Sequence, residues 1–340
     1  MVEAAFHEST LSTPIRDLGL TIAGTSLEPI LTEFLAEVRG AGIHRVTPRF
    51  YLSTEWGVPF DTVAIAIPFY LARPELTAIH AERGDLVEGS SPADILRYLR
   101  HEMGHVINYA YRLYDQKEWI EQFGSITQPY REEYRPKPFS RRFVRHLPGW
   151  YAQKHPDEDW AETFAVWMTQ VEAWREEYAD WPEALRKLLY CDDTMVKLAN
   201  QEPLVTAEDL DEDVTEIRSS LEQFYRSPAT GETTFPRALD GALRAIFGDL
   251  GRPDAGAPEV GRRPASALIL GMERNLTTEV FRWTGHFPER TRPLVRHLVA
   301  RADAMQLACP ESKEAAAAVA LTALVTALAM NYIHRGRYLP

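Results

Sequence analysis

Two histidines and a glutamate in this sequence have a spacing that suits a metal site. Residues 101–105 read His-Glu-Met-Gly-His and match the pattern H-E-x-x-H. On a helix, residues four apart lie one turn apart on the same face, so both imidazoles can bind one Zn²⁺ at about 2.0–2.1 Å. Glu102 lies beside them and can take a proton from a metal-bound water. The pattern therefore predicts His101 and His105 as zinc ligands and Glu102 as a catalytic general base.

The sequence around this motif predicts the helix that it requires. Ser91 suits an N-cap, Pro92 suits the first helical position, and Asp94 completes a capping pattern. We expect a helix over residues 92–114, in which Gly104 lets another element pack closely. The apolar residues that this helix can bury are Leu96, Leu99, Val106 and Tyr109.

A third ligand decides which class of zinc site this is. A metzincin would have Gly at position 108 and His at position 111, where this chain has Asn108 and Tyr111. A gluzincin takes a Glu from a second, downstream helix, and a helical pattern follows Pro156. Glu162 lies there between small and aromatic residues, and a carboxylate on such a face is costly to bury unless it is paired or metal-bound. We therefore expect Glu162 as the third ligand.

Other polar residues near this second helix have candidate roles. Glu158 and Asp159 are poorer candidates for the third ligand, because they fall at the polar start of the helix, where acids suit the helix dipole. Asp159 could also accept the second ring N–H of a zinc-bound histidine, as carboxylates near zinc sites often do. Tyr151 and His155 shortly precede the helix and are candidate donors to the oxyanion of a hydrolytic reaction. The sequence does not choose between these two donors.

The remaining patterns predict an α+β fold that is mostly helical. Apolar residues at helical spacing predict a helix over residues 27–38. Residues 49–52 and 62–67 are rich in β-branched and aromatic residues and predict a small N-terminal β-sheet. From about Leu185 onward the pattern is helical again.

This change of pattern predicts two domains. We expect residues 1–195 to form the domain that carries the metal site. Residues 196–340 then form a helical C-terminal region, whose role the sequence does not indicate. A Gly- and Pro-rich segment over residues 249–264 predicts a linker or long loop within that region.

Composition and charge exclude several functional classes. The net charge of −12 argues against a general nucleic-acid binder. Two cysteines provide no disulfide framework, which fits a reducing compartment. The first ten residues, MVEAAFHEST, show no secretory signal, so a cytoplasmic protein is expected. The sequence leaves the oligomeric state open.

One uncharged segment, residues 315–333, is long enough to cross a membrane. However, Ala dominates it, and Ala contributes little to membrane insertion. Thr322, Thr326 and Asn331 also interrupt it. We therefore expect a buried helix of the C-terminal region and no membrane partner.

Two blocks of sequence resemble a known family. The first is Arg-His-Glu-Met-Gly-His at residues 100–105, and the second is the block at residues 128–167, which ends in HPDEDWAETFAVW. Together they resemble a bacterial family of zinc-binding metallopeptidases, a gluzincin-like group, over roughly the first 200 residues. The resemblance implies a zincin-like fold, hydrolysis of peptide bonds, and Glu162 as the third zinc ligand.

These observations predict a zinc-dependent metallopeptidase that acts on a peptide or protein substrate. One alternative is a zinc hydrolase of another amide. A second is a non-catalytic, zinc-binding regulatory module, in which His146 or His155 closes the site as a fourth ligand. Three protein ligands leave one position open for water, which favours catalysis.

Overall fold

The computed structural model describes residues 10–83, 87–130, 134–169, 173–225, 235, 239–249 and 261–338. The chain divides into two compact units, and each is described by itself. The first comprises Met1–Tyr134, Phe139–Leu147 and Tyr151–Pro228. The second comprises Arg135–Pro138, Pro148–Trp150 and Ala229–Pro340.

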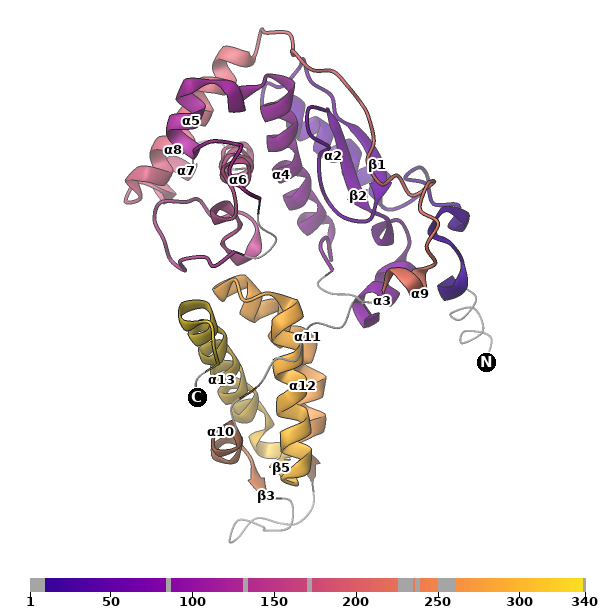
Figure 1. The fold of residues 1–340 in the computed structure, drawn as a ribbon, viewed down its shortest axis with the longest axis vertical. Helices are drawn as coiled ribbons and strands as arrows, with labels where there is room; N and C mark the ends of the chain where they lie inside the picture. The colour runs from indigo at the N-terminus through magenta and orange to yellow at the C-terminus, as the bar shows by residue number, and fades with distance from the viewer. Residues whose placement is uncertain are drawn as a thin grey trace. The chain divides into compact units, whose positions relative to one another are not determined.

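The first unit is mostly helical and contains a small parallel sheet (Figure 1). In the sheet, β1 (Arg49–Ser53) pairs with β2 (Ala64–Pro68), with Arg49 opposite Ala64. The helices are α2 (Leu27–Gly40), α3 (Pro74–Arg83), α4 (Pro92–Ala110), α5 (Lys117–Phe123), α6 (Pro156–Thr169), α7 (Ala173–Glu177), α8 (Pro182–Leu198) and α9 (Leu221–Phe224). Short 3-10 turns occur at Ile15–Leu18, Phe69–Ala72 and Leu113–Asp115, and the turn Pro148–Gln153 contributes its last three residues to this unit. The α+β class with a mostly helical content is therefore as expected.

Helix α4, which carries the H-E-x-x-H motif, begins where the sequence predicts. The Ser91 hydroxyl accepts a hydrogen bond from the Asp94 backbone N–H at 3.2 Å, and Pro92 occupies the first turn. The helix ends at Ala110, four residues before the predicted end. It stops because Arg112 adopts a left-handed backbone conformation, with φ of 46°. The four apolar residues expected to be buried, Leu96, Leu99, Val106 and Tyr109, are buried.

The β-sheet positions the loop of residues 56–60. All five residues of β2 are buried, as is usual for a parallel strand covered on both faces. The Ala66 N–H donates to the Gly57 carbonyl at 2.8 Å, so the loop of residues 56–60 lies along the outer edge of β2. Both predicted strands are confirmed, with bounds shifted by one or two residues.

The first unit extends past the boundary expected at residue 195. After α8, the chain returns to the sheet, where the Val63 N–H donates to Ala207 at 2.8 Å and the Val214 N–H donates to Leu52 at 3.0 Å. Val214 and Leu221 are buried in the same core as α4. These long-range contacts leave no local signal in the sequence, which is why the predicted boundary falls too early.

The second unit is helical, as expected, and also contains a small antiparallel sheet. Its helices are α10 (Leu239–Ile246), α11 (Ala265–Thr284), α12 (Pro288–Ala304) and α13 (Glu314–Arg335). Its strands are β3 (Gly248–Asp249), β4 (Arg262–Pro264) and β5 (Leu307–Pro310), with β5 in the centre. Strands of two to four residues are too short to show the alternation of apolar and polar residues by which a strand is predicted from sequence. Most of the predicted linker at residues 249–264 lies outside the described residues.

Helix α13 contains the uncharged segment and buries one face. Ala317, Leu321 and Val325 lie on that face, and the helix packs against α11. Among the described residues, it is the one helix long and apolar enough to cross a membrane, and a third of the qualifying window (33%) is buried. The helix that we expected to be buried is thus buried on one side only, and the absence of a membrane partner stays a prediction.

Candidate metal centre

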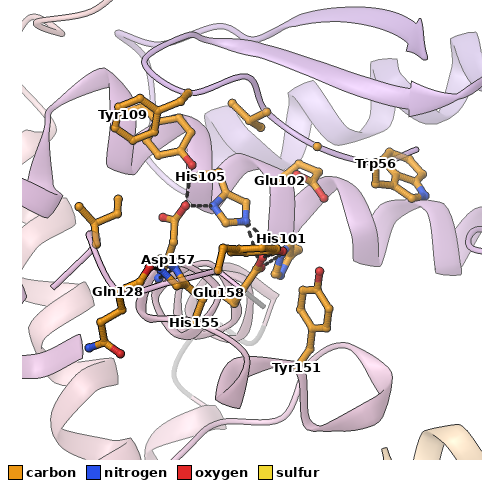
Figure 2. Close-up of a pocket in the computed structure, with 15 residues that line it drawn as sticks. Trp56, His101, Glu102, His105, Tyr109, Gln128, Tyr151, His155, Asp157 and Glu158 are labelled. Atoms are coloured by element: carbon orange, nitrogen blue, oxygen red, sulfur yellow. Dashed lines mark hydrogen bonds and ion pairs between the residues drawn. The ribbon is translucent and has the colours of Figure 1, made fainter. Parts of the chain in front are cut away.

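Three buried side chains from two helices of the first unit converge on one point (Figure 2). His101 and His105 come from α4, and Glu158 comes from α6. Their ligand atoms lie within 4.8 Å of one another. Nε2 of His101 is 3.2 Å from Nε2 of His105 and 3.0 Å from Oε2 of Glu158. Nε2 of His105 is 3.3 Å from the same carboxylate oxygen.

These separations fit a tetrahedral zinc ion. Ligand atoms held at about 2.0–2.1 Å from zinc lie roughly 3.3–3.4 Å apart along the edges of a tetrahedron. The three measured separations of 3.2, 3.0 and 3.3 Å are close to that value. Two imidazoles and a carboxylate are also ligands that zinc prefers. The donor set and its spacing therefore both fit a zinc ion.

The carboxylate in this group is Glu158, whereas the sequence analysis expected Glu162. Oε1 of Glu162 lies 2.9 Å from Nδ1 of His101, the ring nitrogen opposite the convergence point. Oε2 of Glu162 accepts backbone N–H groups of His146 at 3.1 Å and Leu147 at 2.9 Å. Glu158 and Glu162 lie one helical turn apart on the same face of α6. Spacing alone therefore does not distinguish them, and the position of α6 against α4 does.

A second carboxylate contacts the other histidine. Oδ2 of Asp157 lies 3.1 Å from Nδ1 of His105. The Tyr109 hydroxyl donates to this oxygen at 2.5 Å, and the Asn108 amide donates to Oδ1 at 2.7 Å. Carboxylates on the outer nitrogen of metal-binding histidines fix the ring orientation and raise its basicity. Sequence reasoning missed Asp157, because its place in a run of three acids gives no sign of its partner.

Asp159 does not have the role that the sequence suggested. Its carboxylate pairs with Lys187 of α8, with Oδ2 and Nζ 2.5 Å apart, and both side chains are buried. The expected acceptor for the ring N–H of His101 is instead Glu162. Burial raises the pKa of Asp159 to about 7, although Lys187 acts in the opposite direction.

The close approach of α4 and α6 depends on a glycine. A Cβ atom added to Gly104 would lie 2.7 Å from the Ala161 Cα, so no larger residue fits without moving a helix. The Trp160 indole N–H donates to the Gly104 carbonyl at 2.8 Å across the same crossing. The expectation that Gly104 admits a neighbouring element is confirmed, and that element is α6.

Residues 80–233 match a protein-family model described as "Putative zinc-binding metallo-peptidase". This region of the chain is similar to that family. Both helices of the candidate metal centre lie inside the matched region. Searches of curated proteins and of solved structures gave no match.

The candidate metal centre carries a charge pattern that suits a cation. Burial alone would lower the pKa of His101, but its hydrogen bonds to Glu158 and Glu162 raise it to about 9. The pKa of His105 is also raised well above its usual value, since Asp157 and Glu158 outweigh burial. The surrounding carboxylates thus favour positive charge at both imidazoles, and a bound metal ion would replace their protons.

A cleft of about 350 Å³ opens beside the candidate metal centre. Glu102, Tyr151 and His155 all line it, together with the three metal-site residues. Burial raises the pKa of Glu102. The Tyr151 ring packs edge-on against His101, with ring centroids 5.5 Å apart, and its hydroxyl accepts a hydrogen bond from Lys154 Nζ at 3.3 Å. Figure 2 shows Tyr151 reaching into the cleft from the side opposite α4.

The two histidines considered as further ligands have other partners. Nδ1 of His155 accepts the Asp157 N–H at 3.2 Å, so its Nε2 carries the proton donated to the Gln128 carbonyl at 3.0 Å. Nε2 of His146 contacts the Arg97 carbonyl at 2.9 Å. Within the described part of the chain, neither histidine joins the three-residue group.

Proposed function

We propose that this chain is a zinc-dependent peptidase in which His101, His105 and Glu158 hold the metal and Glu102 is the general base. One observation carries the proposal: three buried ligand atoms at tetrahedral spacing border a cleft that also contains a buried glutamate. Three protein ligands leave one coordination position for water or substrate. The zincin-like fold and the gluzincin type belong to the same proposal, with the third ligand moved to Glu158.

The side chains around this site have separate tasks in peptide hydrolysis. When bound, zinc supplies an activated water and polarises the substrate carbonyl. Glu102 accepts a proton from the attacking water and passes it to the nitrogen of the leaving amine. Because burial raises its pKa, Glu102 is a better base than an exposed carboxylate, and it holds the abstracted proton until the leaving amine takes it. Asp157 and Glu162 hold the two imidazoles with their Nε2 atoms toward the metal.

Tyr151 is the better of the two candidate oxyanion donors. An ammonium group can only donate, so the contact with Lys154 makes the Tyr151 oxygen an acceptor and directs its own proton elsewhere. The Tyr130 hydroxyl is one partner for that proton, and a substrate oxygen in the cleft is another. Both ring nitrogens of His155 have hydrogen-bond partners, which favours a role for His155 in capping α6.

The two alternative functions, a non-catalytic zinc-binding module and a hydrolase of another amide, fit the contacts around the site to different degrees. A closed, non-catalytic site would need a fourth ligand, and the histidines considered for it, His146 and His155, bond to backbone groups. A hydrolase of another amide would use the same metal site and the same base. Substrate screening separates that alternative from peptide hydrolysis.

The proposal is tested by zinc content and turnover in matched variants. We expect about one zinc per chain in the wild type, loss of most zinc in Glu158→Ala, and retained but weakened binding in Glu162→Ala. Zinc is measured by elemental analysis, and affinity is measured by chelator competition. We expect Glu102→Gln to keep zinc and to lose cleavage of a broad peptide library by at least about a hundredfold.

Two results would contradict the proposal in different ways. Equal zinc affinity in wild type and Glu158→Ala would exclude Glu158 as a ligand. Cleavage by Glu102→Gln at the wild-type rate would exclude the general base. A zinc-loaded wild type that cleaves small amides but no peptide would support the other hydrolase instead.

A further inference from the structure

An exposed aromatic side chain borders the cleft of the candidate metal centre. Phe60 lines this cleft and is 58% exposed. Its ring packs against Tyr109 and Tyr114, with ring centroids 5.0 and 5.3 Å apart. Tyr109 in turn lies beside the metal-site residue His105, at a centroid distance of 6.0 Å. The exposed ring of Phe60 is thus connected to the proposed zinc ligand His105 through a single intervening ring, that of Tyr109.

The loop that carries Phe60 is fixed by polar contacts. The Tyr114 hydroxyl donates to Asp61 Oδ1 at 2.6 Å, and Arg112 donates to Asp61 Oδ2 at 3.3 Å. The Thr62 hydroxyl donates to the Pro59 carbonyl at 2.7 Å. An aromatic side chain held in place before binding loses little entropy when a ligand covers it. Phe60 therefore forms a rigid apolar contact surface.

A second aromatic side chain from the same loop lies at the other end of the cleft. Trp56 also lines the cleft and stacks on Tyr98, with centroids 5.4 Å apart and rings nearly parallel at 7°. Its indole N–H donates to the Glu88 carbonyl at 3.1 Å. Trp56 is thus fixed on one face by stacking and at its edge by a hydrogen bond.

The proposed zinc ligands lie between these two aromatic contacts. Tyr98, His101, His105 and Tyr109 follow one another along α4, and helical geometry places Tyr98 and Tyr109 about 16 Å apart along the axis. The loop of residues 56–60 runs beside this helix, with Trp56 on Tyr98 and Phe60 on Tyr109. Figure 2 shows Trp56 and Tyr109 on opposite sides of the two histidines.

We propose that the cleft binds an extended peptide whose large apolar side chains contact Phe60 and Trp56 on opposite sides of the scissile bond. This inference rests on the proposed peptidase function. Residues of an extended chain are spaced by about 3.3 Å, so each contact falls within about three residues of that bond. Burying an apolar side chain against an aromatic ring stabilises the complex. A polar side chain at the same position would not provide this stabilisation. The substrate class is therefore an internal, apolar segment of an unfolded peptide.

The test measures cleavage preference in a peptide library. Zinc-loaded wild type is incubated with peptides randomised at three positions on each side of a central bond, and products are quantified by mass spectrometry. We expect enrichment of Phe, Leu, Met and Tyr at one position on each side. Phe60→Ser should reduce the enrichment on one side about tenfold, and Phe60→Leu should preserve it. Trp56→Ala should reduce the enrichment on the other side.

Controls separate this inference from the function on which it rests. Val196→Ser removes an apolar side chain of α8 that is 73% exposed, and it should leave every preference unchanged. The zinc content of each variant reports whether the metal site is intact. Peptide cleavage by the wild type with the same preference in Phe60→Ser would overturn the inference alone. A zinc-loaded wild type that cleaves no peptide would overturn the proposed function as well.

Discussion

At the scale of single residues, the first two turns of α6 contain four buried acids, and each contacts a histidine or a lysine. Burying a carboxylate costs several kcal/mol unless a cation or hydrogen-bond donors compensate it, so every one of these acids needs a partner. The partners are His105 for Asp157, both histidines for Glu158, Lys187 for Asp159 and His101 for Glu162. Two of these acids contact the outer nitrogens of imidazoles, one completes the proposed ligand set, and one joins α6 to α8.

Tyr130 hydrogen-bonds to the proposed ligand Glu158, so its hydroxyl is expected to affect zinc affinity. Its hydroxyl donates to Oε1 of Glu158 at 2.6 Å, which leaves Oε2 for the metal. Partners of this kind typically change metal affinity by about 10–100-fold when removed. We expect Tyr130→Phe to raise the zinc dissociation constant by that factor in chelator competition. Tyr225→Phe, which removes a hydroxyl that contacts His80, serves as the control and should leave zinc affinity unchanged.

At the scale of elements, the crossing of α4 and α6 determines the metal centre. Two ligands come from one helix and the third from the other, so a shift of either helix changes all the distances at once. Gly104 and Ala161 permit the close approach, and Trp160 hydrogen-bonds across it. The ligand geometry therefore depends on a contact between residues that are not ligands themselves.

Replacing Gly104 tests whether the ligand geometry depends on the close contact between α4 and α6. We expect Gly104→Ala to lower the free energy of unfolding by about 1–3 kcal/mol, because the added methyl group meets the Ala161 backbone. Zinc affinity should fall as well, since α6 must move away from His101 and His105. The control is Gly40→Ala in α2, where nothing lies within 4 Å of the added Cβ and no loss is expected. Urea unfolding and chelator competition measure the two effects, and an unchanged zinc affinity in Gly104→Ala would argue against the dependence.

At the scale of the whole molecule, the chain forms two units with separate cores. The core of the first unit is built around α4 and the parallel sheet, and that of the second around α11, α12 and α13. The second unit contains a buried histidine of its own. His286 is fully buried, and its ring nitrogens contact the Thr291 hydroxyl at 2.8 Å and the Tyr338 hydroxyl at 3.1 Å.

His286 makes the second unit sensitive to acid. Burial, with a smaller contribution from Arg290, lowers the pKa of His286 to about 3, against about 6.5 in an unfolded chain. Between these values the unfolded chain binds a proton that the folded unit does not, so stability falls as pH drops from about 6.5 toward 3. From pH 6.5 to 4.5 this loss is about 2–3 kcal/mol.

Urea unfolding of the full chain at several pH values measures this effect. We expect a smaller loss of stability between pH 6.5 and 4.5 in His286→Gln than in the wild type, whatever the variant costs at neutral pH. His334→Gln, at an exposed position on α13, should follow the wild-type curve. An identical acid dependence in His286→Gln would show that other groups cause the loss.

The sequence by itself determined the local structure around the proposed site. Ser91 and Pro92 indicated the start of α4, the H-E-x-x-H spacing placed two imidazoles on one face, and the pattern after Pro156 predicted α6. The two strands and the zinc-binding family were also predictable from short segments. These features are local, because capping, helical periodicity and motif spacing involve residues close together in the chain.

The tertiary structure decided which residues meet across the fold. Glu158 and Glu162 lie on the same helical face, and the less polar sequence around Glu162 favoured it as the ligand. Only the crossing of α4 and α6 brings Glu158 to Nε2 of both histidines. The same crossing gives Asp157 its place beside His105, while Asp159 meets Lys187 of α8 instead of a histidine. Such pairings depend on how helices pack across tens of residues, and no local pattern encodes that packing.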